Sequence, residues 1–384
     1  MRGLALSRRS FLTLVAGVPI WLALPGGLVF AATLRVRKLR HWSAPDHTRI
    51  VIELDAAGRF ETRTYSEPDR VVIEIPNARA DNFEIPVDDG LVRSLTVTTL
   101  GESVLVRVVL ARAADFAAFP LAPNAASEQH RIVLDVRKRL TAAETSAQER
   151  EVESVRQSGD VVVAIDAGHG GNDPGCLGHQ LVEKEVTLAV ARRFAEALGG
   201  RPRLRPLLTR QRDYFVPLGQ RQKIAQNYGA TLFVSIHCNA AASPTARGSE
   251  VFFVSLQGAA DKAAKELVDR ENAADLVGGV APQEVQTPLV DILVNLKQND
   301  AMRKSERLGE LMVRRLEQVP GSESRGLKQG PLAVLKSITC PSVLVELGFV
   351  TNKQDARQLA DGAGQRRYAQ QMAAAIDEYL SATG

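Results

Sequence analysis

The amino-acid sequence predicts an α/β fold with a largely parallel sheet flanked by helices, preceded by an all-β, sandwich-like region. Between residues 160 and 384, strand-like apolar runs alternate with segments of helical periodicity, which is typical of a parallel sheet. Between residues 33 and 138, short β-branched or alternating runs are separated by proline, glycine, asparagine and aspartate. The stretch 139–159 is polar and lacks apolar periodicity, so we expect a partly helical linker there.

The N-terminal residues 1–32 have the features of a twin-arginine signal peptide. The pair Arg8-Arg9 precedes an apolar stretch from Leu14 to Phe30, and small residues follow at Ala31 and Ala32. A membrane anchor is the alternative, but glycines and prolines interrupt the stretch, which is short for a span of about 20 apolar residues. We therefore expect cleavage near Ala31 or Ala32, export to the periplasm, and no transmembrane anchor in the mature protein.

Charge and cysteine content limit the possible binding partners and the possible disulfide bonds. The net charge of +4 has both signs interspersed, which is too mild to indicate a nucleic-acid partner. The three cysteines are odd in number and widely spaced, so we expect small buried residues rather than a disulfide framework.

Both regions can be divided into expected elements. In the β-rich region the expected strands are 48–54, 70–75, 94–98, 103–110 and 131–136. Strands this short at regular spacing favour a sandwich. In the second region the expected strands are 161–166, 204–209, 231–237, 249–255 and 342–346. The helices expected between and after them are 184–198, 218–228, 259–277, 300–316 and 366–380.

Two histidines and a carboxylate form a candidate zinc site. His169 follows the first of these strands, His237 ends the third, and Glu183 begins the first helix. Because ligands bind beyond the carboxyl ends of parallel strands, we expect the three side chains at one rim of the sheet. Such a set leaves one coordination position open for water, as in catalytic zinc sites. Glu185 and His179 are nearby competitors of Glu183 for ligation.

Glu346 ends the last strand and is the candidate catalytic carboxylate. A carboxylate in a run of valine and leucine is costly to bury unless it is paired or useful. Placed at the same rim, it could move protons at the attacking water.

The roles of four further residues remain open from sequence. Asp166 could orient His169, or it could cap the glycine-rich turn at residues 168–171. Arg210 and Arg221 could meet substrate carboxylates, or they could form structural ion pairs with Asp213 or other acids. Asn239 is a candidate for contact with the ligands or the substrate.

These residues lie in motifs that resemble those of the zinc-dependent N-acetylmuramoyl-L-alanine amidases. The motifs include Asp166-Ala-Gly-His-Gly-Gly171, Ser235-Ile-His-Cys-Asn239 and Val345-Glu-Leu-Gly-Phe-Val-Thr-Asn352, and the resemblance spans residues 160–380. It implies that His169, Glu183 and His237 bind one Zn²⁺ and that Glu346 is catalytic. It also implies hydrolysis of the amide bond between muramic acid and the first L-alanine of the peptidoglycan stem. The family often has alanine where this chain has Cys238. Residues 34–136 are similar to AMIN domains, by pattern more than by motif.

The resemblance also implies regulation through the segment 257–297, which the sheet does not need. Glu271 falls on an apolar helical stripe with Ala264 and Leu267, where a carboxylate needs a partner. In exported family members with an AMIN domain, a helix here covers the active site and offers a glutamate to the zinc. Glu271 resembles that residue; the alternatives are a surface salt bridge and a helix packed elsewhere. We then expect autoinhibition, an activator resembling LytM-type proteins, and a role in cell division.

Two other functions compete with this interpretation. A zinc peptidase that cuts within the stem peptide would use the same metal chemistry. A wall-binding or activator protein would carry a degenerate site, whereas all four metal and catalytic residues are present here.

Overall fold

The structure of the protein is a computed structural model that describes residues 33–44, 47–123, 128–255, 258–278, 292–336 and 339–383. The expected signal peptide lies outside the described residues, as does part of the segment 257–297. Among the helices that the structure describes, none combines the length and the apolar character needed to cross a membrane.

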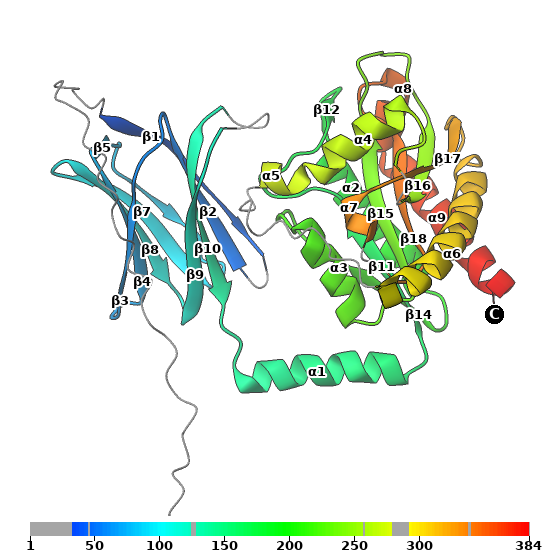
Figure 1. Ribbon diagram of the computed structural model, residues 1–384, viewed down its shortest axis with the longest axis horizontal. Coiled ribbons are helices and arrows are strands. Elements are labelled where there is room, and N and C mark those ends of the chain that lie inside the picture. Colours follow the sequence, from blue (N-terminus) through cyan, green and yellow to red (C-terminus); the bar gives the residue numbers. More distant parts are fainter. Residues whose placement is uncertain are drawn as a thin grey trace, which may run out of the picture. The chain divides into compact units, whose positions relative to one another are not determined.

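The N-terminal region is a sandwich of two five-stranded sheets (Figure 1). One sheet has the order β5-β1-β2-β10-β9 and the other the order β3-β4-β8-β7-β6. Their strands are β1 (Leu34–Ser43), β2 (His47–Leu54), β3 (Glu61–Tyr65), β4 (Arg70–Pro76), β5 (Ala78–Arg79), β6 (Phe83–Pro86), β7 (Val92–Leu100), β8 (Ser103–Leu110), β9 (Ala114–Leu121) and β10 (His130–Lys138).

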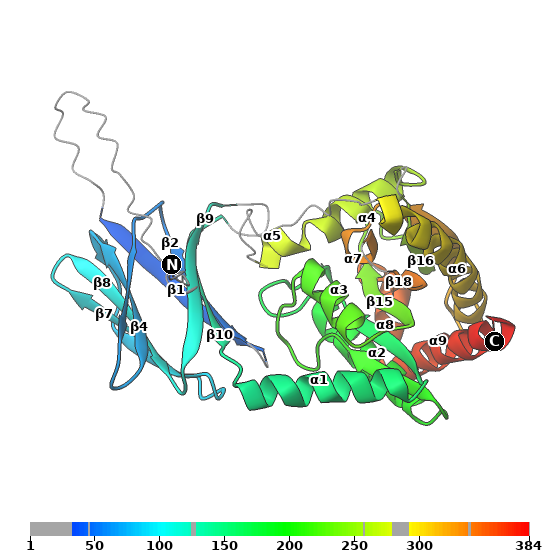
Figure 2. The same cartoon turned by 60° about the horizontal axis from the view of Figure 1, so that its bottom comes forward.

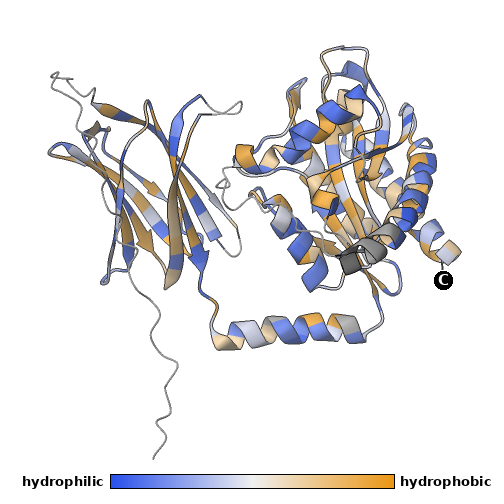
Figure 3. Cartoon of the chain, in the orientation of Figure 1, coloured by the Kyte–Doolittle hydropathy of each residue, from blue (hydrophilic) through white to orange (hydrophobic). Residues whose placement is uncertain are grey.

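The sandwich forms because alternate side chains of its strands are apolar. In β8, the four residues Val104, Val106, Val108 and Leu110 are buried, and the residues between them are partly exposed. They share one core with Ile52 of the other sheet. The linker that follows forms helix α1 (Ala142–Gln157), whose surface is mostly hydrophilic in Figure 3.

The second region contains a six-stranded sheet of order β14-β11-β15-β18-β16-β17. Strands β14 (Leu204–Leu208), β11 (Val161–Ala167), β15 (Leu232–Asn239) and β18 (Ser342–Phe349) are mutually parallel. Strand β16 (Ser249–Val254) runs antiparallel to β18, and β17 (Ser324–Gly330) is parallel to β16. A small hairpin of β12 (Leu177–Gly178) and β13 (Leu181–Val182) precedes the first helix of this region.

Helices cover both faces of this sheet (Figures 1 and 2). The apolar core of one face includes residues of α2 (Glu183–Gly199), α6 (Ile292–Leu316), α8 (Lys353–Ala360) and α9 (Gly362–Thr383). The core of the other face includes residues of α3 (Leu218–Asn227), α4 (Lys262–Asn272) and α7 (Ala333–Lys336). Successive residues of β11 alternate between the two cores, Val163 and Ile165 on one face and Ala164 on the other.

The predicted fold class is confirmed, with local differences. The single helix expected over 259–277 is two helices, α4 and α5 (Ala274–Gly278), separated at Ala273. Strand β9 was not predicted, because its alanines and Pro120 do not resemble a strand. It lies at the edge of its sheet, where proline is tolerated.

Candidate metal centre and active site

The candidate site lies at the carboxyl edge of the parallel strands. His169 follows β11, His237 lies near the end of β15, and Glu346 lies in β18. His237 and Glu346 are direct neighbours in the register of β15 and β18. The parallel topology therefore brings together residues that are far apart in the sequence, as predicted.

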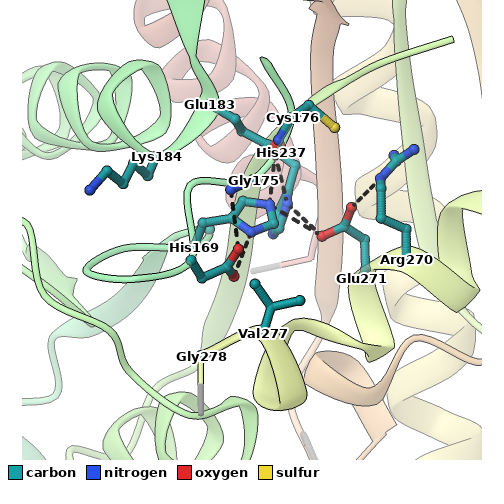
Figure 4. Close-up of polar contacts among 12 residues, drawn as sticks. His169, Gly175, Cys176, Glu183, Lys184, His237, Arg270, Glu271, Val277 and Gly278 are labelled. Carbon is teal, nitrogen blue, oxygen red and sulfur yellow. Dashed lines mark hydrogen bonds and ion pairs between the residues drawn. The ribbon is translucent and has the colours of Figure 1, made fainter. Parts of the chain in front are cut away.

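His169, Glu183 and His237 meet through their ligand atoms (Figure 4). Glu183 Oε1 lies 3.0 Å from His169 Nε2 and 3.1 Å from His237 Nδ1. In a tetrahedral zinc site with ligands at about 2.0–2.1 Å, neighbouring ligand atoms are about 3.3 Å apart. His169 Nε2 is buried and has no hydrogen-bond partner within the described part of the chain, which fits a nitrogen that binds a cation. The donor set and its spacing therefore fit zinc.

Glu183 is held in place by backbone amides from two segments. Its Oε2 accepts the N–H of Cys176 at 2.7 Å, and its Oε1 accepts the N–H of Cys238 at 2.8 Å. Burial opposes ionisation, but His169 and His237 more than offset it and hold the pKa of Glu183 well below its usual value. Of the two competitors, Glu185 is exposed and His179 approaches the carbonyl of Thr351 instead.

His169 is oriented by Asp173, a residue that the sequence did not single out. His169 Nδ1 lies 2.8 Å from Asp173 Oδ2, so the other ring nitrogen, Nε2, faces Glu183. The only signal in the sequence was a carboxylate four residues after the histidine in a glycine-rich turn. The turn depends on its glycines, because a Cβ at Gly168 would lie 2.4 Å from the His237 ring, and Gly170 has a φ of +126°.

Glu346 is a fully buried carboxylate beside the cluster. Neither of its oxygens has a hydrogen-bond partner among the described residues. Burial, together with the negative charges of Glu271 and Glu183, raises its pKa well above the usual value, despite the opposing effect of His237. Because both oxygens are unpaired in the part of the chain that the structure describes, this carboxyl group can take a proton from a neighbouring group or deliver one to it.

Glu271 of α4 also enters the cluster (Figure 4). Its Oε2 lies 3.0 Å from His237 Nδ1 and 3.4 Å from His169 Nε2. The ligand atoms of these three residues all lie within 4.8 Å of one another. Burial alone would raise the pKa of Glu271, but His237 and His169 lower it to about 2. Burial lowers the pKa of His237, but Glu271 and Glu183 raise it to about 10.

Two family models match this chain. A family model described as N-acetylmuramoyl-L-alanine amidase matches residues 163–378, more than half of the chain. The chain belongs to the N-acetylmuramoyl-L-alanine amidase family. A model of the AMIN domain matches residues 38–136, so both resemblances seen in the sequence are confirmed.

Several named amidases are similar to this chain over long stretches. The amidase AmiC of Escherichia coli O6:H1 is 30% identical, over 98% of this chain and 96% of its own length. AmiC of Neisseria meningitidis serogroup B is 29% identical, over 98% of both chains. The solved catalytic domain of CwlV from Bacillus (Paenibacillus) polymyxa is 29% identical, covers 58% of this chain and 98% of its own, and has a TM-score of 0.44.

In this amidase, Arg210 and Arg221 hold the glycine-rich loop. Arg210 donates to the carbonyls of Ala167, Gly168 and Lys184. Arg221 donates to the carbonyl of His169 at 2.8 Å and to Asp166 Oδ1 at 2.8 Å. Both side chains are almost entirely buried, so these contacts support the structural alternative rather than contact with substrate.

The partners of Asp166 differ from both alternatives considered from the sequence. Its carboxylate accepts hydrogen bonds from Thr209, Ser235 and Arg221, and it makes none to the His169 ring. Asp213, the acid considered as a partner of the arginines, pairs with Lys184 at 2.6 Å. Two ion pairs therefore stabilise the loop, Arg221–Asp166 at its start and Lys184–Asp213 at Gly171.

Proposed function

We propose that this amidase hydrolyses the bond between the lactyl group of muramic acid and the first L-alanine of the peptidoglycan stem. His169, Glu183 and His237 would hold one Zn²⁺. The observation that carries the proposal is the unpaired, buried carboxylate of Glu346 next to a cluster whose spacing fits zinc.

Each residue around the site has a distinct role in the proposed reaction. When bound, zinc supplies Lewis-acid catalysis, which polarises the carbonyl of the substrate and makes a water more acidic. Glu346 takes the proton from the attacking water and delivers it to the nitrogen of the departing amine as the C–N bond breaks. Asp173 fixes the orientation of His169 through Nδ1, and the backbone amides of Cys176 and Cys238 fix Glu183.

We further propose that α4 inhibits the enzyme. Glu271 places a fourth ligand atom against the two histidines, at the position that catalysis requires to be open. An activator resembling LytM-type proteins would bind the displaced segment and shift the population toward the open state, in proportion to its differential affinity.

The signal peptide and the AMIN region bear on where the enzyme acts in the cell. We propose that the twin-arginine signal exports the folded chain to the periplasm and that residues 33–138 direct it to the division site. Cleavage there would contribute to the separation of daughter cells.

The ligand assignment predicts that His237→Ala loses zinc and activity together, because the two protein ligands that remain are too few to hold the metal. Zinc would be measured by elemental analysis of the purified chain. His179→Ala is the matched control, since this histidine lies in the nearby hairpin and does not face Glu183. Full zinc content and normal turnover in His237→Ala would contradict the assignment.

The role of Glu346 predicts that Glu346→Gln keeps zinc while activity falls by about 10²-fold or more. Glutamine preserves the shape of the side chain but cannot accept the proton. Glu185→Gln, which changes an exposed carboxylate on α2, should leave both quantities unchanged. If zinc is lost along with activity, Glu346 is a ligand instead.

The inhibitory role of α4 predicts that Glu271→Ala raises the basal hydrolysis of purified peptidoglycan without any activator. The products should be stem peptides with free N-terminal L-alanine, identified by mass spectrometry. Glu266→Ala changes an exposed glutamate of the same helix and should have no effect. An unchanged rate with retained zinc and fold would refute inhibition by Glu271, and cleavage within the stem would indicate a peptidase.

The AMIN assignment predicts that a fusion of the signal, residues 33–138 and a fluorescent protein concentrates at division sites. The motive is that this region has a core of its own. The control fusion lacks residues 33–138 and should be diffuse in the periplasm. A diffuse signal from both fusions would count against targeting by this region.

A further inference from the structure

Asn239, the last residue of β15, presents an oriented carbonyl oxygen beside the active site. Its Nδ2 donates to Glu250 Oε1 at 2.7 Å, and its Oδ1 accepts the N–H of Ala240 at 2.8 Å. A carboxylate accepts hydrogen bonds and cannot donate them when ionised. The amide of Asn239 can therefore face Glu250 only through Nδ2, which leaves Oδ1 on the other side.

Glu250 is itself held by two cations of β17. Its Oε2 lies 2.8 Å from Lys328 Nζ and 3.1 Å from Arg325 Nε, and the residue is 3% exposed. Glu250 and Glu346 are paired across β16 and β18, and residues directly opposite each other point to the same face of a sheet. Glu250, which orients Asn239, therefore lies directly opposite the candidate catalytic carboxylate of Glu346 on the neighbouring strand.

The Oδ1 atom of Asn239 is covered by the inhibitory helix. Arg270 Nη2 donates to it at 3.0 Å, while Arg270 Nε donates to Glu271 Oε1 at 3.1 Å. Figure 4 shows Arg270 and Glu271 side by side, with Glu271 directed at the two histidines. Two consecutive residues of α4 therefore block two places in the closed enzyme. Glu271 takes the position at the histidines that catalysis needs for water, and Arg270 takes the acceptor on Asn239.

We propose that Asn239 is a substrate-binding residue whose Oδ1 accepts an amide N–H of the muramoyl peptide, and that Arg270 takes the place of this donor in the closed enzyme. The inference rests on the proposed displacement of α4. Once α4 leaves, Oδ1 keeps the N–H of Ala240 but loses the Arg270 donor, so one of its two lone pairs faces the uncovered site and can accept an N–H of the substrate. The substrate offers such donors in the acetamido group of muramic acid and in the amides of its stem.

The test uses the full chain in two backgrounds, the parent and the open variant Arg270→Ala/Glu271→Ala. In the open variant, Asn239→Ala should raise KM for peptidoglycan by about three- to tenfold, with little change in kcat or zinc content. Asn239→Asp keeps an oxygen acceptor, so its KM should lie nearer to that of the open variant. In the parent, Asn239→Ala should instead raise the basal rate, because it removes an anchor of α4.

Asn272→Ala is the matched control, because this residue also anchors α4 but lies away from Asn239. It donates to the carbonyl of Pro331 and accepts the N–H of Ala333. It should raise the basal rate of the parent and leave KM of the open variant unchanged. A purely structural role of Asn239 would instead make Asn239→Asp as harmful as Asn239→Ala, since both lose the donor to Glu250. That result, or an unchanged KM in Asn239→Ala, overturns the proposal.

Two ligands that contain the scissile amide distinguish the source of the N–H, and their binding is measured in the open variant carrying Glu346→Gln, so that they stay intact. N-acetylmuramoyl-L-alanyl-D-glutamate has one stem amide more than N-acetylmuramoyl-L-alanine. If Asn239→Ala weakens the binding of the longer compound alone, the donor is that second stem amide. If it weakens both, the donor lies on muramic acid or its first amide; if neither, the proposal fails. An open variant no faster than the parent would refute inhibition by α4, whereas these binding constants would still decide the role of Asn239.

Discussion

The site depends on an excess of buried negative charge that needs a cation. Glu183, Glu271 and Glu346 surround the two imidazoles of His169 and His237, and all five residues are nearly inaccessible to water. Charges of one sign are costly to bury together unless they are neutralised. Zinc at this position would neutralise them, and burial beside Glu271 and Glu183 raises the pKa of Glu346 for the same physical reason.

The scaffold around this charge is built from hydrogen bonds to the backbone. Arg210 and Arg221 donate to carbonyls of residues 167–169, and Glu183 accepts two backbone amides. The loop that carries His169 can therefore turn sharply without leaving the backbone carbonyls of residues 167–169 unpaired. The Arg221–Asp166 pair lies beneath the loop and stabilises the site without being part of it.

Helix α4 makes two kinds of contact with the domain that it covers, apolar and polar. Its apolar residues Ala264, Leu267 and Val268 belong to the core of one sheet face, whereas Arg270 and Glu271 meet polar groups of the site. The first set gives the helix a general affinity for the sheet. The second set fixes the position of the helix on the sheet, because Glu271 contacts the two histidines and Arg270 contacts Asn239.

The sequence by itself determined the fold class and the family and indicated the residues of the candidate metal site, because strand periodicity and the histidine and glutamate motifs are local patterns. It also indicated Glu271, because a carboxylate on an apolar stripe is anomalous within its own helix. It did not indicate Asp173, Glu250 or Arg270, and it left Arg210 and Arg221 undecided. These roles were decided by the tertiary structure, because each depends on which groups face a side chain across the sheet or the loop. Arg221 is 55 residues from Asp166 and Arg270 is 31 residues from Asn239, separations at which no periodicity carries information.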